Sequence, residues 1–282
     1  MAAFQAIAPA KINLFLHIVG KKQDNYHLLE TFFIFAKLYD ILEIRTDYKK
    51  SMVIFVNDGC EINSRYNTIT KAINLLLQHI TKHVEISVRV IKNIPVAAGL
   101  GGGSSDAGAV IRTLGKYWNI EDHVLNEVAA DVGADVPVSV NCATAFAKGT
   151  GDDLHHCKNF TIPKSIVLVN PGKPLSTARV FQEYKGNFSA PLDFPKVDTI
   201  DLIELMRCTK NDLQEVAITI VPEIEDILSF LQKQTGCIIT RMSGSGATCF
   251  GIFDSEEKAK SAANNVQSHY PNWWVHTTSL IV

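Results

Sequence analysis

The sequence has no long apolar run, and this absence excludes a conventional membrane span. Its longest uninterrupted apolar stretches, such as residues 32–36 and 52–56, are far below the roughly 18 residues that a transmembrane helix needs. Residues 1–10 lack a basic start and lead into Pro9 and Lys11, so a secretory signal is not expected. We therefore predict a cytoplasmic protein with no membrane partner.

Charge of one sign is also lacking. Lys and Arg total 27 and Asp and Glu total 29, which gives a net charge of −2, and no basic run stands out. Nucleic acids and anionic lipid surfaces both require a concentrated positive footprint. The sequence therefore predicts no nucleic-acid partner.

The sequence has little that could hold a metal or a disulfide framework. The six cysteines include no CxxC pair and lie far apart, which disfavours both a disulfide scaffold and a structural zinc site. His79 and His83 are four residues apart and His155 and His156 are adjacent, but no carboxylate or thiol accompanies them at ligand spacing. We expect ordinary exposed histidines and no metal-binding residues.

What is present is enough apolar sequence for a large core. Of 282 residues, 46% are hydrophobic and 20% charged, which is typical of a globular chain of one large or two middling domains. Periodicity predicts helices at 69–80, 107–118 and 121–131. Strands are predicted at 12–19, 28–36, 38–45, 52–56 and 84–91. The first half should therefore be helices packed on a largely antiparallel sheet.

The pattern breaks in a polar stretch at residues 152–163, which we interpret as the neighbourhood of a domain boundary. We predict domains at 1–157 and 158–282. A helical tract is expected at 198–234, interrupted near Pro222, with a second helix at 255–269. Strands are expected at 166–170, 237–242, 248–253 and 273–278. This order is the split βαβ plan, with two helices on one face of a small antiparallel sheet.

The most informative segment is residues 95–107, PVAAGLGGGSSDA. Four glycines lead directly into a pattern with helical periodicity. Glycine lets backbone N–H groups turn toward a ligand, and a helix N-terminus adds N–H donors and partial positive charge. We therefore predict a nucleotide phosphate site. The residues assigned to ATP are Pro95, Val96, Ala97, Ala98, Gly99, Leu100, Gly101, Gly102, Gly103, Ser104 and Ser105.

A simpler interpretation of this segment is a flexible loop. Ser104 or Ser105 would cap the next helix, and Asp106 would complement its dipole. We expect capping as well, but it does not explain four glycines within five positions. A Walker A loop, a Rossmann fingerprint and the HRD and DFG triplets are absent. The phosphate loop therefore belongs to another design.

Three further features are ambiguous on the residues alone. Asp135, between a Gly-Ala turn and a Val-Pro pair, is as easily a helix cap or turn acid as a catalytic group. Lys11 interrupts an apolar strand, where a lysine usually reaches solvent. A second glycine turn at 242–248 is ordinarily a tight hairpin. Together with the first loop, its small residues could approach a phosphate or an acceptor.

The order of these segments resembles a known family. PAKINL at 9–14, DNYH at 24–27, the 95–107 loop, GADVP at 133–137 and SGSGATCFG at 243–251 span essentially the whole chain. The chain is similar to the galactokinase, homoserine kinase, mevalonate kinase and phosphomevalonate kinase (GHMP) superfamily. Within it, the triple glycine, the PAKINL start and the Tyr-His pair resemble the 4-diphosphocytidyl-2-C-methyl-D-erythritol kinases.

The resemblance implies an α+β, two-domain GHMP-type kinase. Its N-terminal domain would be like domain 2 of ribosomal protein S5, its C-terminal domain ferredoxin-like, and the substrates would lie in the cleft between them. The implied reaction is ATP-dependent phosphorylation of the 2-hydroxyl of 4-diphosphocytidyl-2-C-methyl-D-erythritol, in the non-mevalonate route to isopentenyl diphosphate. Mg²⁺ would be carried with ATP, and the chain would be a monomer or homodimer.

The resemblance also assigns the site residues. Lys11 and Asp135 are the implied catalytic pair: Asp135 would take the hydroxyl proton, and Lys11 would orient it or stabilise the transferring phosphate. For the cytidine diphosphate substrate, His27 would hydrogen-bond the cytosine edge and two rings would contact the base. The full set of implied substrate-binding residues is Asn13, Tyr26, His27, Thr177 and Phe181.

Two residues depart from the family pattern Arg-x-Asp-Gly-Tyr-His. Asn25 stands in place of Gly and can hold a left-handed turn. Lys22 stands in place of Arg and loses the planar fork needed for a bidentate contact.

Two other functions remain open from the sequence. Another alcohol kinase of the superfamily would share the ATP loop but lack a cytidine pocket. A catalytically silent nucleotide-binding or nucleic-acid-binding module could use the same N-terminal fold, although the neutral charge balance and the presence of both Lys11 and Asp135 argue against it.

Overall fold

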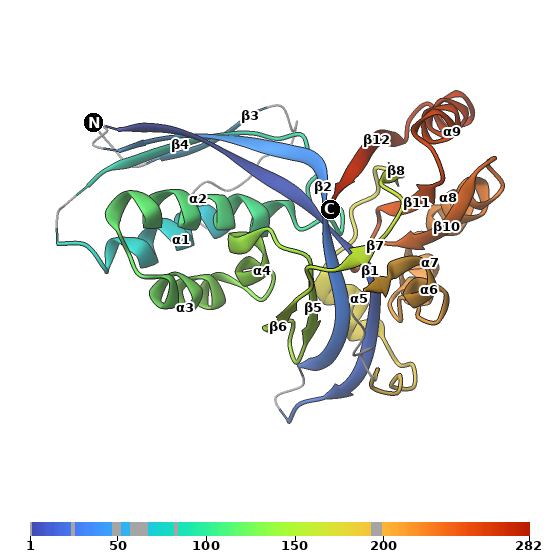
Figure 1. The fold of residues 1–282 in the computed structure, drawn as a ribbon, viewed down its shortest axis with the longest axis horizontal. Coiled ribbons are helices and arrows are strands. Elements are labelled where there is room, and N and C mark those ends of the chain that lie inside the picture. Colours follow the sequence, from blue (N-terminus) through green and yellow to red (C-terminus); the bar gives the residue numbers. More distant parts are fainter. Residues whose placement is uncertain (1, 24–25, 47–51, 57–66, 82–83, 193–198) are drawn as a thin grey trace. The chain divides into compact units, whose positions relative to one another are not determined.

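The computed structural model describes residues 2–23, 26–46, 52–56, 67–81, 84–192 and 199–282. It comprises two compact units built from interleaved segments (Figure 1). Unit 1 consists of Met1–Lys11, Leu38–Val96 and Gly101–Ala143, and unit 2 of Ile12–Lys37, Ala97–Leu100 and Thr144–Val282. Strands β1 (Ala3–Lys21) and β2 (His27–Thr46) pair with each other and contribute residues to both units. A single boundary after residue 157 stays a prediction.

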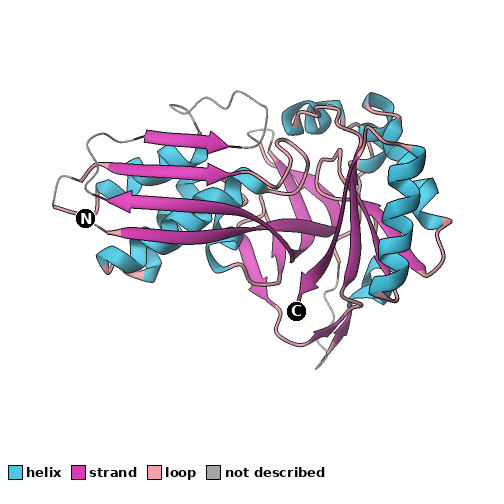
Figure 2. Cartoon of the chain, turned by 90° about the horizontal axis from the view of Figure 1, so that it is seen from above, coloured by secondary structure: helices cyan, strands magenta, loops and turns pink. Residues whose placement is uncertain are grey.

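Unit 1 is a sheet with helices over one face (Figures 1 and 2). Strand β4 (Ile86–Ile91) pairs antiparallel with β2 and parallel with β3 (Met52–Val56). The helices are α1 (Thr68–Leu77), α2 (Gly102–Trp118), α3 (Asp122–Val132) and α4 (Val136–Asn141). The predicted helices on a mostly antiparallel sheet are confirmed, with β3 and β4 as a parallel pair.

Local sequence explains the helix boundaries. The side chain of Asn67 accepts a hydrogen bond from the Thr70 N–H, which caps α1. Helix α2 ends at Asn119, which adopts the left-handed conformation with φ 54°. The apolar faces of these helices meet the sheet in one core, which contains Leu76, Val88 and Ile111. This core fixes the start of α2, where the glycine-rich loop ends.

Unit 2 contains the split βαβ plan. Its strands are β8 (Ser165–Asn170), β10 (Cys237–Met242), β11 (Cys249–Phe253) and β12 (Trp274–Ile281). They pair antiparallel in the order β10-β11-β8-β12, with Leu168 of β8 between Phe250 and His276. Helices α8 (Glu223–Gln232) and α9 (Glu256–His269) pack on this sheet. The ferredoxin-like prediction for this region is therefore confirmed.

Unit 2 also contains elements that periodicity missed. Strand β5 (Ala145–Lys148) pairs with β2 and with β6 (Asp153–His156), so the polar stretch predicted as a break holds a paired strand. The remaining elements are β7 (Phe160–Thr161), β9 (Ile200–Asp201), α5 (Thr177–Glu183), α6 (Leu202–Arg207) and α7 (Gln214–Ile220).

No helix in the described part of the chain combines the length and apolar character that a bilayer crossing requires.

Two predicted boundaries were wrong. The strands expected at 28–36 and 38–45 are one continuous strand, β2, in which exposed Lys37 lies between the buried residues Ala36 and Leu38. The tract expected at 198–234 is broken near Pro222 as predicted, and also between α6 and α7. There, Thr209 and Asn211 bond backbone groups with their side chains.

Candidate active site

Lys11 and Asp135 form an ion pair in unit 1. Nζ of Lys11 lies 2.9 Å from Oδ2 of Asp135. The lysine side chain is 4% exposed and the aspartate side chain is 41% exposed. Lys11 therefore does not snorkel to solvent, as a lysine interrupting a strand ordinarily would. It holds a carboxylate that solutes can reach.

Asp135 occupies the N-cap position of α4, but its side chain makes no capping hydrogen bond. Its φ of −87° and ψ of −3° differ from the extended backbone of an ordinary N-cap residue. Its backbone carbonyl accepts a hydrogen bond from the Ser139 hydroxyl at 2.8 Å, which steadies the turn. The interpretation of Asp135 as a side-chain cap is therefore wrong.

The glycine-rich loop reaches the start of α2 beside this ion pair. Gly101 is the N-cap residue in the left-handed conformation, φ 64°, and no side chain caps the helix. A Cβ on Gly101 would lie 3.1 Å from Cε of Lys11, so a side chain here would press on the lysine, and the positive φ independently favours glycine. The first N–H groups of α2 thus begin next to Lys11.

The expected capping by Ser104 or Ser105 is wrong, because the helix begins at Gly102 and both serines lie inside its first turn. The Ser105 hydroxyl instead donates to the Pro9 carbonyl at 2.7 Å, which joins α2 to β1. Asp106 is buried in an ion pair with Lys92. With no side-chain cap, the helix N-terminus suits an anion.

The middle of the loop packs on the second glycine turn within unit 2. The Gly99 carbonyl accepts a hydrogen bond from the Ser243 hydroxyl at 2.9 Å, and the Ala98 carbonyl accepts one from the Thr248 N–H at 3.1 Å. A Cβ on Gly99, whose φ is 76°, would lie 2.3 Å from the Ser243 carbonyl oxygen. The turn at 242–248 therefore supports the loop in addition to joining β10 to β11.

Asn13 and Thr177 lie near the same turn. Asn13 is buried, donates from Nδ2 to the Thr31 hydroxyl at 2.8 Å, and has no hydrogen-bond partner for Oδ1 among the described residues. Thr177 is exposed, and its hydroxyl is 2.7 Å from that of Ser245. Thr177 therefore offers a hydroxyl that a ligand can reach, whereas Asn13 offers an oxygen that is buried and unpaired among the described residues.

His27 sits within an aromatic group in unit 2. Its ring centroid lies 5.4 Å from that of Phe181, and 6.0 Å from that of Tyr184 in an edge-on arrangement. Burial, with a smaller contribution from Lys21, lowers the pKa of His27 below its ordinary 6.5. A neutral ring at pH 7 offers one donor and one acceptor, which is what a pyrimidine edge requires.

Tyr26 is 67% exposed, and its carbonyl accepts a hydrogen bond from the Lys22 N–H at 2.7 Å. Asp24 and Asn25 lie outside the described residues, so the expected left-handed turn at Asn25 stays a prediction. The effect of Lys22 on a bidentate contact also stays a prediction.

Two residues near the site were not singled out from the sequence. Tyr184 was not predicted, because no motif surrounds it, and Ser245 was included only as part of a weak hairpin signal.

The chemistry-bearing residues thus form two groups. Lys11, Asp135 and the start of α2 belong to unit 1, and the aromatic group around His27 belongs to unit 2. Among the described residues, no cluster of three or more His, Cys, Asp or Glu side chains could hold a metal ion. The first group provides a carboxylate, an ammonium and helix N–H donors, which together suit phosphoryl transfer to an alcohol.

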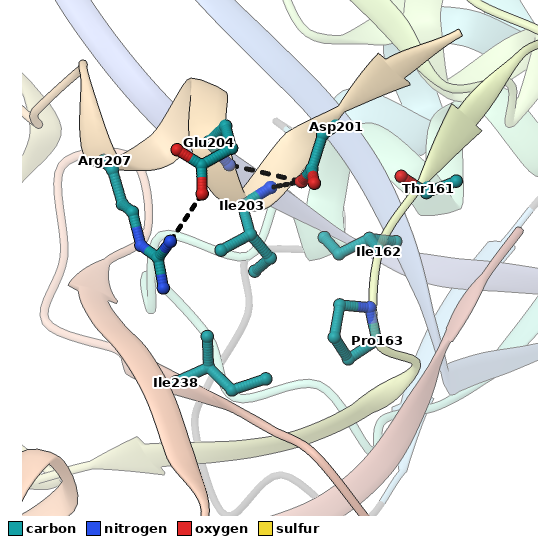
Figure 3. Close-up of a pocket in the computed structure, with 8 residues that line it drawn as sticks. All are labelled: Thr161, Ile162, Pro163, Asp201, Ile203, Glu204, Arg207 and Ile238. Atoms are coloured by element: carbon teal, nitrogen blue, oxygen red, sulfur yellow. Dashed lines mark hydrogen bonds and ion pairs between the residues drawn. The ribbon is translucent and has the colours of Figure 1, made fainter.

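A cavity of about 410 Å³ lies elsewhere in unit 2 (Figure 3). It is lined by Thr161, Ile162, Pro163, Asp201, Ile203, Glu204, Arg207 and Ile238. Its polar groups largely satisfy one another: Glu204 accepts from Arg207, and Asp201 caps α6. None of the predicted site residues lines it, and we assign it no role.

Comparison with known proteins identifies the family. Residues 67–147 match the GHMP kinases N-terminal domain and residues 194–272 match the GHMP kinases C-terminal model. The chain is 53% identical to the 4-diphosphocytidyl-2-C-methyl-D-erythritol kinase of Wolbachia sp. subsp. Drosophila simulans (strain wRi). It is 47% identical to that of Ehrlichia ruminantium (strain Gardel). Both alignments cover 100% of each chain.

Solved structures agree with the sequence relatives. A crystal structure of 4-(cytidine 5'-diphospho)-2C-methyl-D-erythritol kinase is similar with a TM-score of 0.80 and 28% identity, covering 98% of this chain and 99% of that one. Homoserine kinase from Cytophaga hutchinsonii shares the fold, with a TM-score of 0.71 and 15% identity over 100% and 98% of the two chains. The chain therefore belongs to the GHMP small-molecule kinases, in the family of 4-diphosphocytidyl-2-C-methyl-D-erythritol kinases.

Proposed function

We propose that this chain phosphorylates the 2-hydroxyl of 4-diphosphocytidyl-2-C-methyl-D-erythritol with ATP, in the non-mevalonate route to isopentenyl diphosphate. The observation that carries the proposal is the pair formed by buried Lys11 and accessible Asp135 beside the uncapped N-terminus of α2. Full-length identity of about half to relatives named for this substrate supports the choice of acceptor.

In the proposed reaction, ATP supplies the γ-phosphoryl group that is transferred. The glycine-rich residues 95–105 bind its phosphates through backbone N–H groups at the start of α2. Asp135 accepts the proton of the attacking hydroxyl as the new O–P bond forms and the bond from the γ-phosphorus to the bridging oxygen breaks, so that ADP leaves. Lys11 orients that carboxylate and places a positive charge where negative charge spreads over the phosphoryl oxygens.

Substrate recognition follows from the aromatic group. The neutral His27 ring hydrogen-bonds the cytosine edge, and Phe181 and Tyr26 offer rings to its faces. Asn13 and Thr177 provide polar contacts to the rest of the substrate, since both present side-chain groups near the 242–248 turn. The proposed domains are residues 1–157, the N-terminal ATP-binding and catalytic domain, and residues 158–282, the C-terminal GHMP-kinase-type domain.

Mg²⁺ is proposed to enter with ATP, held by phosphates and water, because small hard cations retain much of their hydration in such sites. A cytoplasmic location, no nucleic-acid or membrane partner, and a monomeric or homodimeric state are further parts of the proposal.

An assay of ADP release tests this function. Purified chain with Mg-ATP is offered the cytidine substrate, mevalonate, homoserine or no acceptor. We expect turnover only with the cytidine substrate. Equal or greater turnover with a free alcohol would favour another activity of the superfamily, and no turnover with any acceptor would favour a silent nucleotide-binding module.

A further inference from the structure

Three buried charged side chains form a cluster in unit 1 that the proposed reaction does not use. Nζ of Lys92 contacts Oδ2 of Asp40 and lies 2.8 Å from Oδ2 of Asp106. The three residues are 6%, 0% and 1% exposed, respectively. Two carboxylates thus share one ammonium group in the interior.

The cluster connects the segments that precede and follow the glycine-rich loop. Lys92 directly follows β4, and Asp106 lies in the second turn of α2, so the ion pair joins the two ends of the segment that contains residues 95–105. Asp40, from β2, also accepts hydrogen bonds through Oδ1 from the N–H groups of Asn93 and Ile94, at 2.6 and 2.9 Å. The residues that enter the glycine-rich loop and the helix that leaves it therefore share one anchor.

The loop itself is shaped to this anchor. A Cβ on Gly102 would lie 3.3 Å from Nζ of Lys92 and 3.5 Å from Oδ2 of Asp40. The first residue of α2 therefore rests directly on the cluster. Oδ1 of Asp106 is buried with no hydrogen-bond partner among the described residues. The cluster and the start of α2 are therefore in close proximity.

Stability alone explains this arrangement poorly. Burying charges costs free energy that the ion pairs recover only in part, and apolar residues of similar volume are often at least as stabilising. Here two carboxylates contact one lysine, and one carboxylate oxygen has no hydrogen-bond partner among the described residues. A role in fixing the backbone geometry around the cluster explains the buried charges better than a gain in stability does.

We propose that Lys92, Asp40 and Asp106 form an anchor that holds both ends of the glycine-rich loop in the geometry that binds the nucleotide triphosphate. All three are positioning residues that act through the backbone of residues 93–105. This inference rests on the proposed function only in naming ATP as the ligand.

Asp106→Ala tests the anchor with the least disturbance to folding, because Lys92 and Asp40 remain as a balanced pair. We expect the equilibrium Kd for a non-hydrolysable ATP analogue, measured by calorimetry without acceptor, to rise about tenfold. KM for ATP should rise in parallel, while KM for the cytidine substrate stays within about twofold. Asp106→Asn, whose amide oxygen can still accept from Lys92, should restore analogue binding to within about threefold of wild type.

Leu114→Ala is the matched control. Leu114 is fully buried on the same helix, away from the loop, so the variant loses core packing but keeps the anchor. It should lower Tm at least as much as Asp106→Ala while leaving the Kd for the analogue unchanged. The double variant Lys92→Met/Asp106→Leu gives a second test. It removes the ion pair between the two ends of the loop, and it does not leave two buried carboxylates facing each other without the lysine. It should weaken analogue binding as Asp106→Ala does.

The outcomes separate the anchor from the proposed function. If wild type binds the analogue and Asp106→Ala binds it equally well, the anchor is wrong and the proposed function stands. A rise in Kd that Leu114→Ala reproduces at equal loss of Tm would also overturn the anchor, because it would be a general effect of stability. If wild type binds no ATP analogue, both the proposed function and the anchor fail.

Discussion

Lys11 and Asp135 are 124 residues apart in the sequence, and their side chains meet at 2.9 Å in unit 1. The lysine is buried and the aspartate is accessible, whereas two charged residues placed for solubility would both be exposed. Asp135 also sits where a helix cap would stabilise α4 by about 1 kcal/mol, yet its side chain turns to the lysine instead. This geometry favours a chemical role over a structural one.

Replacing either member of this pair should stop the chemistry and spare nucleotide binding. For Asp135→Asn and Lys11→Met we expect kcat to fall by about 10²- to 10⁴-fold, the usual contribution of a positioned proton acceptor or charge stabiliser. The Kd for an ATP analogue should change by less than about threefold. Single-turnover rates and calorimetry measure the two quantities, and an Asp135→Asn variant with near-normal kcat would remove Asp135 as the base.

Gly101 should be intolerant of any side chain. Gly101 has φ 64°, and a Cβ at this position would lie 3.1 Å from Cε of Lys11, so we expect Gly101→Ala both to strain the backbone and to displace the lysine. We expect about 1 kcal/mol loss of stability together with a fall in kcat of at least about tenfold.

Gly172→Ala provides the comparison for Gly101→Ala. Gly172 has a similar φ of 70°, and nothing lies within 4 Å of its Cβ position. This variant should lose a similar amount of stability and retain kcat. If both variants lose activity equally, the contact between Gly101 and Lys11 has no catalytic consequence.

His27→Ala should weaken the cytidine substrate alone. Loss of hydrogen bonds to the base should raise its KM by about tenfold, with the KM for ATP nearly unchanged. Because burial and Lys21 lower the pKa of His27, the ring is neutral at pH 7 and gains a proton only below its ordinary pH range. Substrate affinity should therefore be flat from pH 7 to 8 and weaken in acid, and the acid loss should be absent from His27→Ala. An unchanged KM in this variant would remove His27 from the base pocket.

The stability of the protein should show the titration of Asp106. Burial raises the pKa of Asp106 to about 7, with Asp40 adding to the rise and Lys92 opposing it. The folded state then binds more protons than the unfolded state between the unfolded pKa of 3.8 and the folded pKa. The stabilising contribution is complete below pH 3.8 and is lost as pH rises toward 7.

Asp106→Asn removes this titration. Denaturant unfolding from pH 4 to 8 should show wild type losing stability relative to Asp106→Asn as pH rises, with a slope of at most about 1.4 kcal/mol per pH unit. Glu43→Gln, at an exposed ion pair with Arg89, is the control and should leave the pH dependence as in wild type. Parallel stability curves for wild type and Asp106→Asn would contradict the raised pKa.

Much of the fold could be predicted from periodicity, because its helices and ferredoxin-like strands bury clear apolar faces. Periodicity did not predict that two of the expected strands form the single strand β2, because Lys37 resembles a polar break between two apolar runs. Strand β6 was missed because its residues are mostly exposed and it is stabilised by pairing with β5. Such pairing is a tertiary property with little local signal.

The site was less predictable from the residues themselves. The glycine-rich loop indicated an anion site on physical grounds, but Lys11 and Asp135 were paired only through the family resemblance, since nothing local in either segment specifies the other. The predicted capping by Ser104 or Ser105 failed because helix α2 begins earlier, at Gly102. Tyr184 lies in a segment without a motif, so only the structure reveals its ring against that of His27.

The most direct test of the proposed function is ³¹P NMR of a mixture of the chain, Mg-ATP and 4-diphosphocytidyl-2-C-methyl-D-erythritol. With wild type, we expect a new phosphomonoester resonance to grow in step with ADP, and the cytidine diphosphate resonances to remain. With Asp135→Asn, the nucleotide should still bind while the new resonance fails to appear on the same timescale. Absence of the resonance with wild type, or its growth at the wild-type rate with Asp135→Asn, would contradict the account.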